Sequence, residues 1–204
     1  GQNVVHFSGA DSLDVLAPAT SQGVNPGGFH PLQTFASIKH AIENIPGSTF
    51  AIEAEGPLQE TLKEMAAALE GKWIPLGPGD KVLYHAAAVL ACNYLVTLVK
   101  LSTDLWQTFG VPSKEATSSL LPLIRGTVNN LENVGLPDCL TGPIARGDVG
   151  TIEKHIAALE TKAPQLLPVY LEMGRQTVPI ALAKGKIDQE RASQLRSVLN
   201  YTQN

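Results

Sequence analysis

The hydrophobic and polar positions follow a strand pattern in the first third of the chain. Short apolar runs stand at residues 3–7, 29–32, 49–54 and 72–76. Residues 56–70 carry apolar side chains at helical spacing, and Pro57 suits the first turn of that helix. Asp11 or Ser12 is expected to cap a short helix through Leu16, and residues 25–28 are expected to form a turn. Strands that alternate with helices predict a parallel α/β sheet.

Beyond residue 79 the pattern is helical only. Helices are predicted at about 80–109 and 113–133, from near Asp148, at about 163–174, and after Asp188. Gly110, followed by Pro112, ends the first of these helices, and Asp188 is expected to cap the last. The predicted fold class is therefore α/β followed by all-α, with domains at residues 1–77 and 78–204.

The longest apolar run, residues 83–99, contains two polar side chains, His85 and Asn93. Eight positions at about 100° each bring them within roughly 80° of one another on a helix, two turns apart. The pair is typical of the floor of a small-molecule cleft. The alternative is that both are core residues whose polar atoms bind neighbouring carbonyl groups.

A membrane span is a competing interpretation of the same run, because Lys81 and Lys100 bracket it. Four alanines weaken its lipophilicity, and a His and an Asn near its middle are costly in hydrocarbon. A central helix surrounded by other helices is the favoured interpretation. We therefore expect no membrane partner.

Composition narrows the class of protein. The 204 residues carry a net charge of −4 and the pI is near 5.7, so the charge does not indicate a protein that binds nucleic acid. The two cysteines, Cys92 and Cys139, provide neither a disulfide framework nor a metal site. No signal peptide is evident, so a cytoplasmic location is expected. Because Gly1 leads directly into a strand, we expect it to be a cleavage scar or proteolytic end with an N-terminal portion missing.

No dinucleotide fingerprint is complete in this sequence. Gly77-Pro78-Gly79 follows a strand and precedes a helix, but Val82 occupies the third glycine position. This segment is interpreted as an interdomain hinge. Sequence patterns for a P-loop, a nucleophile elbow or a zinc protease do not occur either.

Six motifs in order carry a resemblance that spans almost the whole chain. They are residues 6–10 (HFSGA), 30–35 (HPLQTF), 55–56 (EG), 85–88 (HAAA) with Asn93, 121–123 (LPL) and 141–148 (TGPIARGD). The chain resembles a bacterial family of uncharacterised Rossmann-like oxidoreductases. Members pair a nucleotide-binding domain with a helical domain of unknown function, similar to the dimerisation domain of pyrroline-5-carboxylate reductase and 6-phosphogluconate dehydrogenase type proteins.

The resemblance implies that this chain begins at about the fourth strand of the Rossmann sheet. Residues 1–77 would be the C-terminal part of an NAD(P)-binding domain, and residues 78–204 a 6-phosphogluconate-dehydrogenase-like substrate and dimerisation domain. NAD or NADP is the implied cofactor of the parent protein. The phosphate-binding loop would lie upstream, so the chain alone is expected to bind the cofactor weakly and to be inactive.

Candidate cofactor and catalytic residues follow from this placement. Ser8, Gly9 and Ala10 end a strand, where small residues let the backbone approach a nicotinamide ring. His30 precedes Pro31, which holds its backbone extended and directs the ring into the same crevice. A histidine there suits proton donation near neutral pH, and the alternative is that His30 only caps a turn.

The helical region supplies the remaining candidates. The related 3-hydroxyacid dehydrogenases use a Lys four residues before an Asn, but that position is Val89 if Asn93 is the equivalent. His85, one turn earlier, is then the candidate proton donor beside Asn93. Thr141 and Arg146 are candidates to bind a substrate carboxylate or phosphate. The alternative is that Arg146 and Asp148 fix a tight loop by a salt bridge and a cap.

Two functional classes stay open. The first is an NAD(P)-dependent oxidoreductase acting on a small carbonyl, imine or hydroxy-acid substrate. The second is a non-catalytic metabolite-binding or dimerisation module with a Rossmann-like remnant. A solvent-connected cleft that contains His30, His85 and Asn93 would favour the first. A homodimer is expected in either case, because the apolar helix has more apolar surface than the few predicted helices can cover.

Overall fold

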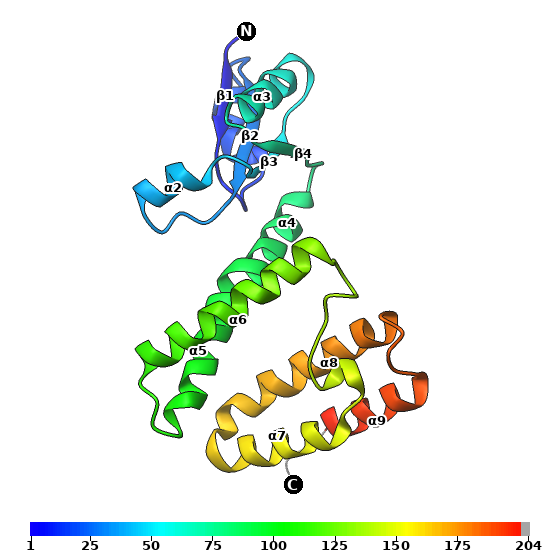
Figure 1. Cartoon of the computed structure of the whole chain (residues 1–204). Coiled ribbons are helices and arrows are strands. Elements are labelled where there is room, and N and C mark those ends of the chain that lie inside the picture. The colour runs from blue at the N-terminus through cyan, green and yellow to red at the C-terminus, as the bar shows by residue number, and fades with distance from the viewer. Residues whose placement is uncertain (201–204) are drawn as a thin grey trace. The chain divides into compact units, whose positions relative to one another are not determined.

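The computed structural model describes residues 1–200 and divides the chain into two compact units, Gly1–Val96 and Thr97–Asn204 (Figure 1). The boundary lies inside the long helix that follows the last strand. Helix α4 (Asp80–Ala88) belongs to the first unit because its Lys81 side chain is buried against the sheet. The predicted division between residues 77 and 78 marks the end of the strands, and as a domain boundary it stays a prediction.

The first unit contains a four-stranded, mostly parallel sheet in the order β1-β2-β3-β4. The strands are Asn3–His6, Asn25–Leu32, Thr49–Glu53 and Lys72–Pro75. The β1–β2 and β3–β4 pairs are parallel as predicted, but β2 and β3 are antiparallel. The link between β2 and β3 contains only helix α2 (Ile38–Asn44) and returns the chain without crossing a face of the sheet.

The predicted turn at residues 25–28 is wrong, because these residues form the first half of β2. The two glycines instead allow close packing on both faces of the strand. A Cβ on Gly27 would lie 3.0 Å from Leu58 Cδ2, and one on Gly28 would lie 2.7 Å from Lys81 Nζ. The glycine signal therefore marks close side-chain approach rather than a change of chain direction.

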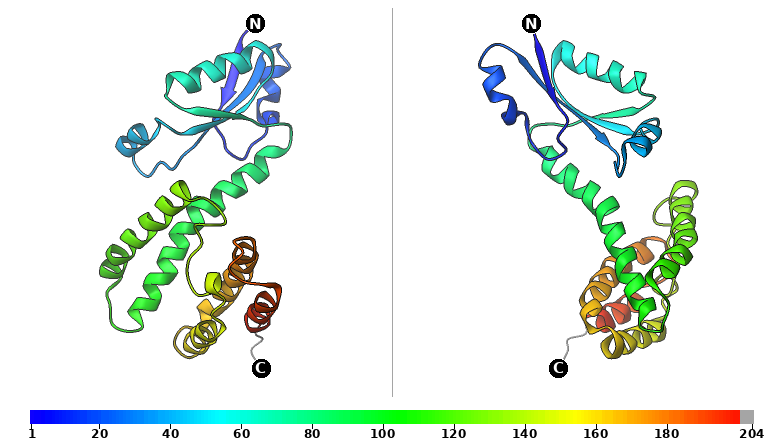
Figure 2. Two further views of the ribbon diagram at one scale, coloured as in Figure 1. Left: turned by 45° about the vertical axis from the view of Figure 1, so that its right-hand side comes forward. Right: turned by 90° about the vertical axis from the view of Figure 1, so that its left-hand side faces the viewer.

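One face of the sheet is apolar and is covered by helix α3 (Gly56–Ala68), as Figure 2 shows. Phe29 on β2 stacks on Phe50 on β3 with ring centroids 4.6 Å apart. Leu58 and Leu62 of α3 complete this core together with Ile52, Ala54 and Ala66. The predicted helix over residues 56–70 is confirmed within two residues. Between β1 and β2, Ser12 caps the short helix η1 (Leu13–Leu16) as predicted, and α1 (Ala17–Thr20) follows it.

The long apolar helix runs over Asp80–Gln107 and contains α4, a single π-helical segment (Val89–Asn93) and α5 (Tyr94–Gln107). By length and composition it is the one helix among residues 1–200 that is apolar enough to cross a membrane. None of its apolar window is buried. The expectation that other helices surround it is therefore wrong for this chain by itself.

The second unit is helical, with α6 (Ser113–Asn133), α7 (Val149–Lys162), α8 (Leu167–Ala183) and α9 (Gln189–Leu199) (Figure 1). Short 3₁₀ turns precede α7 and α8 at Ile144–Arg146 and Pro164–Leu166. Asp148 and Asp188 cap α7 and α9 as predicted. The helix predicted at 163–174 instead continues to residue 183. The core of this unit lies among α7, α8 and α9, and its fully buried members include Ile152, Val178, Ala181, Ala192, Leu195 and Leu199.

Candidate functional site

The second face of the sheet in the Gly1–Val96 unit is polar, and the strand register explains which residues share it. His6 pairs with Gly28, and Gly28 pairs with Glu53. His30 lies two residues beyond Gly28 and so points to the same face. On α4, Lys81, Tyr84 and His85 follow helical spacing and face this side of the sheet. Polar side chains from three strands and one helix therefore meet here.

A buried charged group lies at one end of this face. Lys81 is 2% exposed, and its Nζ lies 3.2 Å from Glu53 Oε2 and 3.3 Å from His6 Nε2. Burial lowers the pKa of His6, and the Lys81 ammonium lowers it further. The Lys81–Glu53 pair compensates two charges that would be costly alone in this position. It also fixes the first turn of α4 to the sheet.

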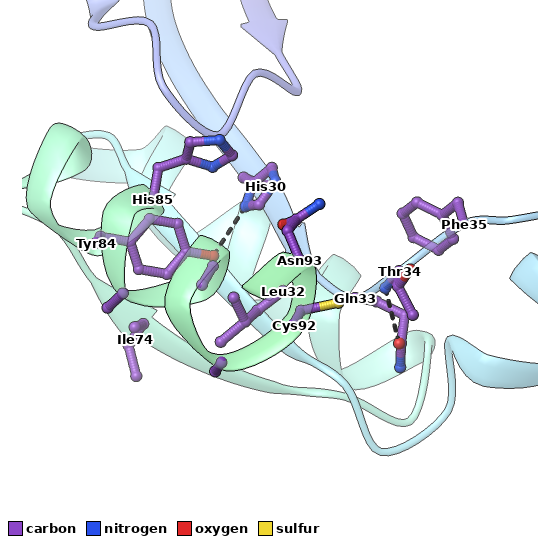
Figure 3. A pocket seen from close by; sticks show the side chains of 13 residues that line it. His30, Leu32, Gln33, Thr34, Phe35, Ile74, Tyr84, His85, Cys92 and Asn93 are labelled. Atoms are coloured by element: carbon purple, nitrogen blue, oxygen red, sulfur yellow. Dashed lines mark hydrogen bonds between the residues drawn. The ribbon is translucent and has the colours of Figure 1, made fainter. Parts of the chain in front are cut away.

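His30 is held by Tyr84, as Figure 3 shows. His30 Nδ1 and Tyr84 Oη are 2.8 Å apart, and the two rings meet edge to face. Burial lowers the pKa of His30, with further contributions from His85 and Lys81. Burial also raises the pKa of Tyr84 to about 12, so its phenol keeps its proton at neutral pH. His30 is therefore a neutral imidazole at pH 7, oriented by a phenol.

The second ring nitrogen of His30 faces His85 across Gly9. The His30 and His85 ring centroids are 6.3 Å apart. A Cβ on Gly9 would lie 2.7 Å from His30 Nε2 and 2.8 Å from His85 Nδ1. Within residues 1–200, His85 Nδ1 is the one buried side-chain nitrogen or oxygen without a hydrogen-bond partner. The two imidazole rings therefore pack directly against Gly9, where no side chain larger than hydrogen fits.

A cavity of about 570 Å³ opens beside these imidazoles (Figure 3). His30, Tyr84, His85 and Asn93 give it polar groups, and Gln33 and Thr34 add further polar side chains. The rest of the lining is apolar or weakly polar and consists of Leu32, Phe35, Ile74, Ala87, Ala88, Ala91 and Cys92. No Lys or Arg is among these lining residues. The cavity is suited to a small molecule with an apolar body and a hydrogen-bonding head.

His30, His85 and Asn93 thus line one cavity, and their catalytic roles stay predictions. His85 and Asn93 do not belong to one regular α-helix, because the π-helical segment ends at Asn93. Segments of this kind are frequent at functional sites. Asn93 is exposed rather than paired in the core, which excludes for Asn93 the alternative of a satisfied core residue.

The predicted cofactor residues form the loop after β1. The Ser8 hydroxyl accepts hydrogen bonds from the Ala10 and Asp11 amides and donates to the Asp11 carboxylate, so it is committed to the loop. Gly9 is buried beside the two imidazoles, and Ala10 is exposed. Because the two imidazoles cover Gly9, the assignment of Ser8, Gly9 and Ala10 to the cofactor stays a prediction. Among residues 1–200 no group of three His, Cys, Asp or Glu side chains is placed to hold a metal ion.

Thr141 and Arg146 line a different cavity, of about 430 Å³, within the Thr97–Asn204 unit. Lys184 and Lys186 also line it. Lys184 Nζ donates to the Asp138 and Leu140 carbonyl oxygens, so its ammonium supports the loop. Asp148 accepts from the Thr151 hydroxyl at Oδ2 and from the Thr151 amide at Oδ1, and these two hydrogen bonds lower the pKa of Asp148. The described ion pairs do not include Arg146 with Asp148, so the predicted salt bridge is not formed, whereas the predicted cap is.

The sequence interpretation missed Tyr84, Lys81 and Glu53. Lys81 stands four residues before His85 and three before Tyr84, so helical spacing offered it as a neighbour of both. Glu53 is a carboxylate at the end of an otherwise uncharged strand, which signals a buried partner. That partner lies 28 residues away along the chain and could not be identified from spacing.

Comparison with solved structures shows the same fold in proteins of low sequence identity. BF3122 of Bacteroides fragilis, described as a provisionally assigned NADP oxidoreductase, superposes with a TM-score of 0.67 at 22% identity, covering 87% of this chain and 65% of its own. TM1727 of Thermotoga maritima gives 0.61 at 23%, covering 96% and 68%. A reductive aminase of Aspergillus terreus, in complex with NADPH and ethyl levulinate, gives 0.51 at 17%, covering 96% and 69%. This chain thus spans about two thirds of the length of each.

These likenesses establish the fold class, a partial Rossmann-like sheet followed by a helical region. No curated protein matches the sequence. A family model described as a domain of unknown function, DUF2520, matches residues 48–177. Because the match covers more than half of the chain, this protein belongs to the DUF2520 family.

Proposed function

We propose that this chain forms the substrate-binding part of an NAD(P)-dependent oxidoreductase that acts on a small carbonyl, imine or hydroxy-acid compound. The convergence of His30 and His85 on one wall of the cavity carries the proposal. Reduction of a C=O or C=N bond needs a proton donor beside the heteroatom, and two imidazole nitrogens are available there. The NADP oxidoreductase and reductive aminase names of two proteins of similar fold support the same class.

The chain's own residues have separate tasks in this proposal. When bound, a nicotinamide dinucleotide would supply or accept the hydride. Tyr84 orients His30, and the Lys81–Glu53 pair anchors α4 so that His85 lines the same cavity as His30. The apolar residues of the lining, among them Leu32 and Ile74, would contact the hydrocarbon part of a substrate. Among the cavity's lining residues no cation favours a carboxylate, so neutral carbonyl or imine compounds are the preferred substrates.

The test is turnover by the complete protein encoded by the gene that contains this sequence. NAD(P)H oxidation is measured with a panel of small ketones, aldehydes and preformed imines. His85→Ala is expected to lower kcat/KM about a hundredfold, as for a lost proton donor, with little change in melting temperature. The matched control is His155→Ala, which removes an imidazole from the second unit. Asn93→Ala tests the second polar residue on the same wall.

A non-catalytic metabolite-binding module is the alternative outcome. It would give no turnover, and His85→Ala would weaken ligand binding alone. A loss of roughly 1 to 3 kcal/mol of stability with unchanged turnover would remove His85 from the site. The 204-residue chain itself is expected to bind NAD(P) only weakly in titration calorimetry, and micromolar binding would contradict that expectation.

We also propose that Thr141 and Arg146 bind an anionic group, either on the cofactor or on a charged substrate. Arg146 is exposed on the rim of its cavity, and Lys186 adds a second cation. Arg146→Gln should raise the Michaelis constant for a charged ligand and leave that for a neutral ligand unchanged. Equal effects on both ligands would contradict the assignment.

A homodimer is the proposed assembly. Leu83, Leu90 and Val96 on the long helix are between 64% and 76% exposed, and Leu123 on α6 is 67% exposed. Apolar surface of this extent favours a second copy of the same helices. Light scattering should give twice 21.7 kDa, and Leu123→Glu should shift the chain toward a monomer. A monomer that sediments with phosphatidylcholine vesicles would contradict the dimer and favour a membrane.

A further inference from the structure

A second apolar cavity, of about 640 Å³, lies in the Thr97–Asn204 unit, and the proposed reaction does not use it. Residues from the end of α5, from α7 and from the start of α8 line it. Its floor is fixed, because Leu159 belongs to the core of the unit and Leu105 packs against that core. Phe109, which is 65% exposed, lines it at the surface. We call this space the α7 cavity, and its volume is typical of small-molecule sites.

The residues that α7 gives to the cavity form one stripe along the helix. Ala158 and Leu159 stand three and four positions after His155, and Lys162 stands seven positions after it. Seven residues are about two helical turns, so His155 and Lys162 share a face and are separated by a rise of about 10 Å. The two residues between them provide a hydrocarbon path of that length.

Most polar side chains of the α7 cavity already have hydrogen-bond partners. His155 Nδ1 and Tyr170 Oη lie 2.8 Å apart, and this contact joins α7 to α8 at one end of the stripe. The Thr108 hydroxyl donates to the Leu105 carbonyl oxygen. The polar group that these contacts leave to receive a ligand is the ammonium of Lys162.

Lys162 lies at the other end of the stripe. The ion pairs among residues 1–200 do not include it. The lining of the α7 cavity contains no Asp or Glu, and the residues three and four positions before Lys162 are Ala158 and Leu159. One cation beside an apolar path is complementary to a hydrocarbon chain that carries one negative charge.

We propose that the α7 cavity binds an aliphatic monocarboxylate of medium chain length. The carboxylate, which is ionised at neutral pH, lies on Lys162. The chain follows Ala158 and Leu159 toward the His155–Tyr170 pair and contacts the ring of Phe109. A phosphate ester is a poorer match, because a single cation leaves part of its charge uncompensated. This binding involves neither NAD(P) nor the cavity beside His30, so it stands apart from the proposed oxidoreductase function.

A purely structural role for Lys162 predicts a different result. Lys162 stands in the last turn of α7, where a cation stabilises the helix end through the helix dipole. In that role, Lys162→Met would lower the melting temperature and leave ligand affinity unchanged. In the proposed site, Lys162→Met lowers the affinity for a carboxylate.

The test is titration calorimetry of the 204-residue chain without cofactor, with octanoate as the probe. Butanoate should bind at least about tenfold more weakly, because fewer methylene groups are buried. Octylammonium has the same chain and should bind several-fold more weakly than octanoate, because its charge is repelled by Lys162. Nitrogen-15 NMR of the histidine rings locates the site: octanoate should shift the signals of His155 and leave those of His30 unchanged.

Two pairs of variants separate the head group from the chain. Lys162→Met should weaken octanoate binding several-fold, whereas Lys154→Met, on the same helix but outside the cavity lining, should leave it unchanged. Ala158→Glu should abolish binding, because it places a carboxylate in the chain path. Ala157→Glu is its matched control, since Ala157 is exposed and does not line the α7 cavity. If Ala158→Glu does not fold, Lys162→Glu replaces it with the same expected loss.

Three results of the titrations would overturn the inference: equal binding of octanoate and octylammonium, His155 signals that octanoate does not change, or equal effects of Lys162→Met and Lys154→Met. Light scattering during the titration adds a fourth. The mass should stay constant, and a dimer that dissociates as octanoate binds would show that the α7 cavity is a surface between two copies of the chain instead.

Discussion

The two units each contain a histidine bonded to a tyrosine, and the two pairs have almost the same geometry. His30 Nδ1 and Tyr84 Oη are 2.8 Å apart in the first unit, as are His155 Nδ1 and Tyr170 Oη in the second. Both pairs meet edge to face, with ring centroids 5.6 and 5.8 Å apart. Burial raises the pKa of both tyrosines. The pair alone therefore does not define a site.

The surroundings of the two pairs differ. His30 faces His85 and lies near the buried Lys81, whereas the cavity beside His155 is lined mainly by Leu105, Phe109, Ala158 and Leu159. The second pair has no other imidazole among the residues that line its cavity. The second imidazole, His85, is therefore what distinguishes the cavity beside His30 from the cavity beside His155, which has Thr108 and Lys162 as its other polar lining residues.

The charged pairs of the two units differ in the same way. Lys81 and Glu53 are 3% and 9% exposed in their side chains, whereas Lys100 and Asp104 on α5 are 66% and 31% exposed. A surface pair contributes at most about 1 kcal/mol, whereas breaking a buried pair leaves an uncompensated charge. The sheet unit thus holds the buried Lys81–Glu53 pair next to its candidate site, whereas the core of the helical unit is apolar.

Removing one partner of the buried pair is expected to have the largest effect on stability. Lys81→Met should lower the free energy of unfolding by about 3 to 5 kcal/mol, because Glu53 is left buried and charged. Urea unfolding is followed through Trp73 on β4, in a Trp106→Phe background that leaves one reporter in the sheet unit.

Lys100→Met is the matched control and should change stability by at most about 1 kcal/mol. The double variant Lys81→Met with Glu53→Gln should recover part of the loss, since no buried charge remains. If Lys81→Met and Lys100→Met were equally mild, the contrast between the two units would be wrong.

The site was predictable from the sequence to the extent that local patterns determine it. His85 stood out because it interrupts an apolar run, and His30 because Pro31 fixes its backbone. The strands and the helical caps followed from local signals in the same way. The antiparallel β2–β3 pair did not, because nothing in the apolar run at 29–32 encodes strand direction.

The rest of the site depends on contacts that spacing cannot supply. Tyr84 meets His30 across 54 positions of sequence, and Lys81 meets His6 across 75. Gly27 and Gly28 looked like a turn because the side chains that need their space, Leu58 and Lys81, lie far along the chain. Tertiary contacts thus reversed a local interpretation that was sound by itself.

Removing the two phenol hydroxyls sharpens the comparison between the histidine–tyrosine pairs. Tyr84→Phe and Tyr170→Phe should each cost about 1 kcal/mol, because each loses one hydrogen bond of 2.8 Å. Tyr84→Phe should also change the nitrogen-15 NMR signals of the His30 ring, and Tyr170→Phe those of the His155 ring alone. An effect of Tyr170→Phe on the His30 signals would contradict the distinction.

Lowering the pH is expected to destabilise the two units at different pH values, and this is the smallest of the effects predicted here. The folded pKa values of His30 and His6 lie below 6.5, chiefly through burial. The unfolded chain therefore binds more protons than the folded chain as the pH falls below about 6.5, and the stability of the sheet unit declines from that point. In the helical unit, hydrogen bonds from Thr151 lower the pKa of Asp148 from 3.8, so the stability that Asp148 contributes is lost only near and below pH 4.

Single-tryptophan variants that keep either Trp73 or Trp106 report melting of each unit between pH 7.5 and 3.5. As the pH is lowered, the melting temperature reported by Trp73 should fall first. His30→Gln should flatten the slope of that melting temperature against pH between pH 6.5 and 5. Parallel curves for both reporters would contradict the assignment of neutral imidazoles to the sheet unit.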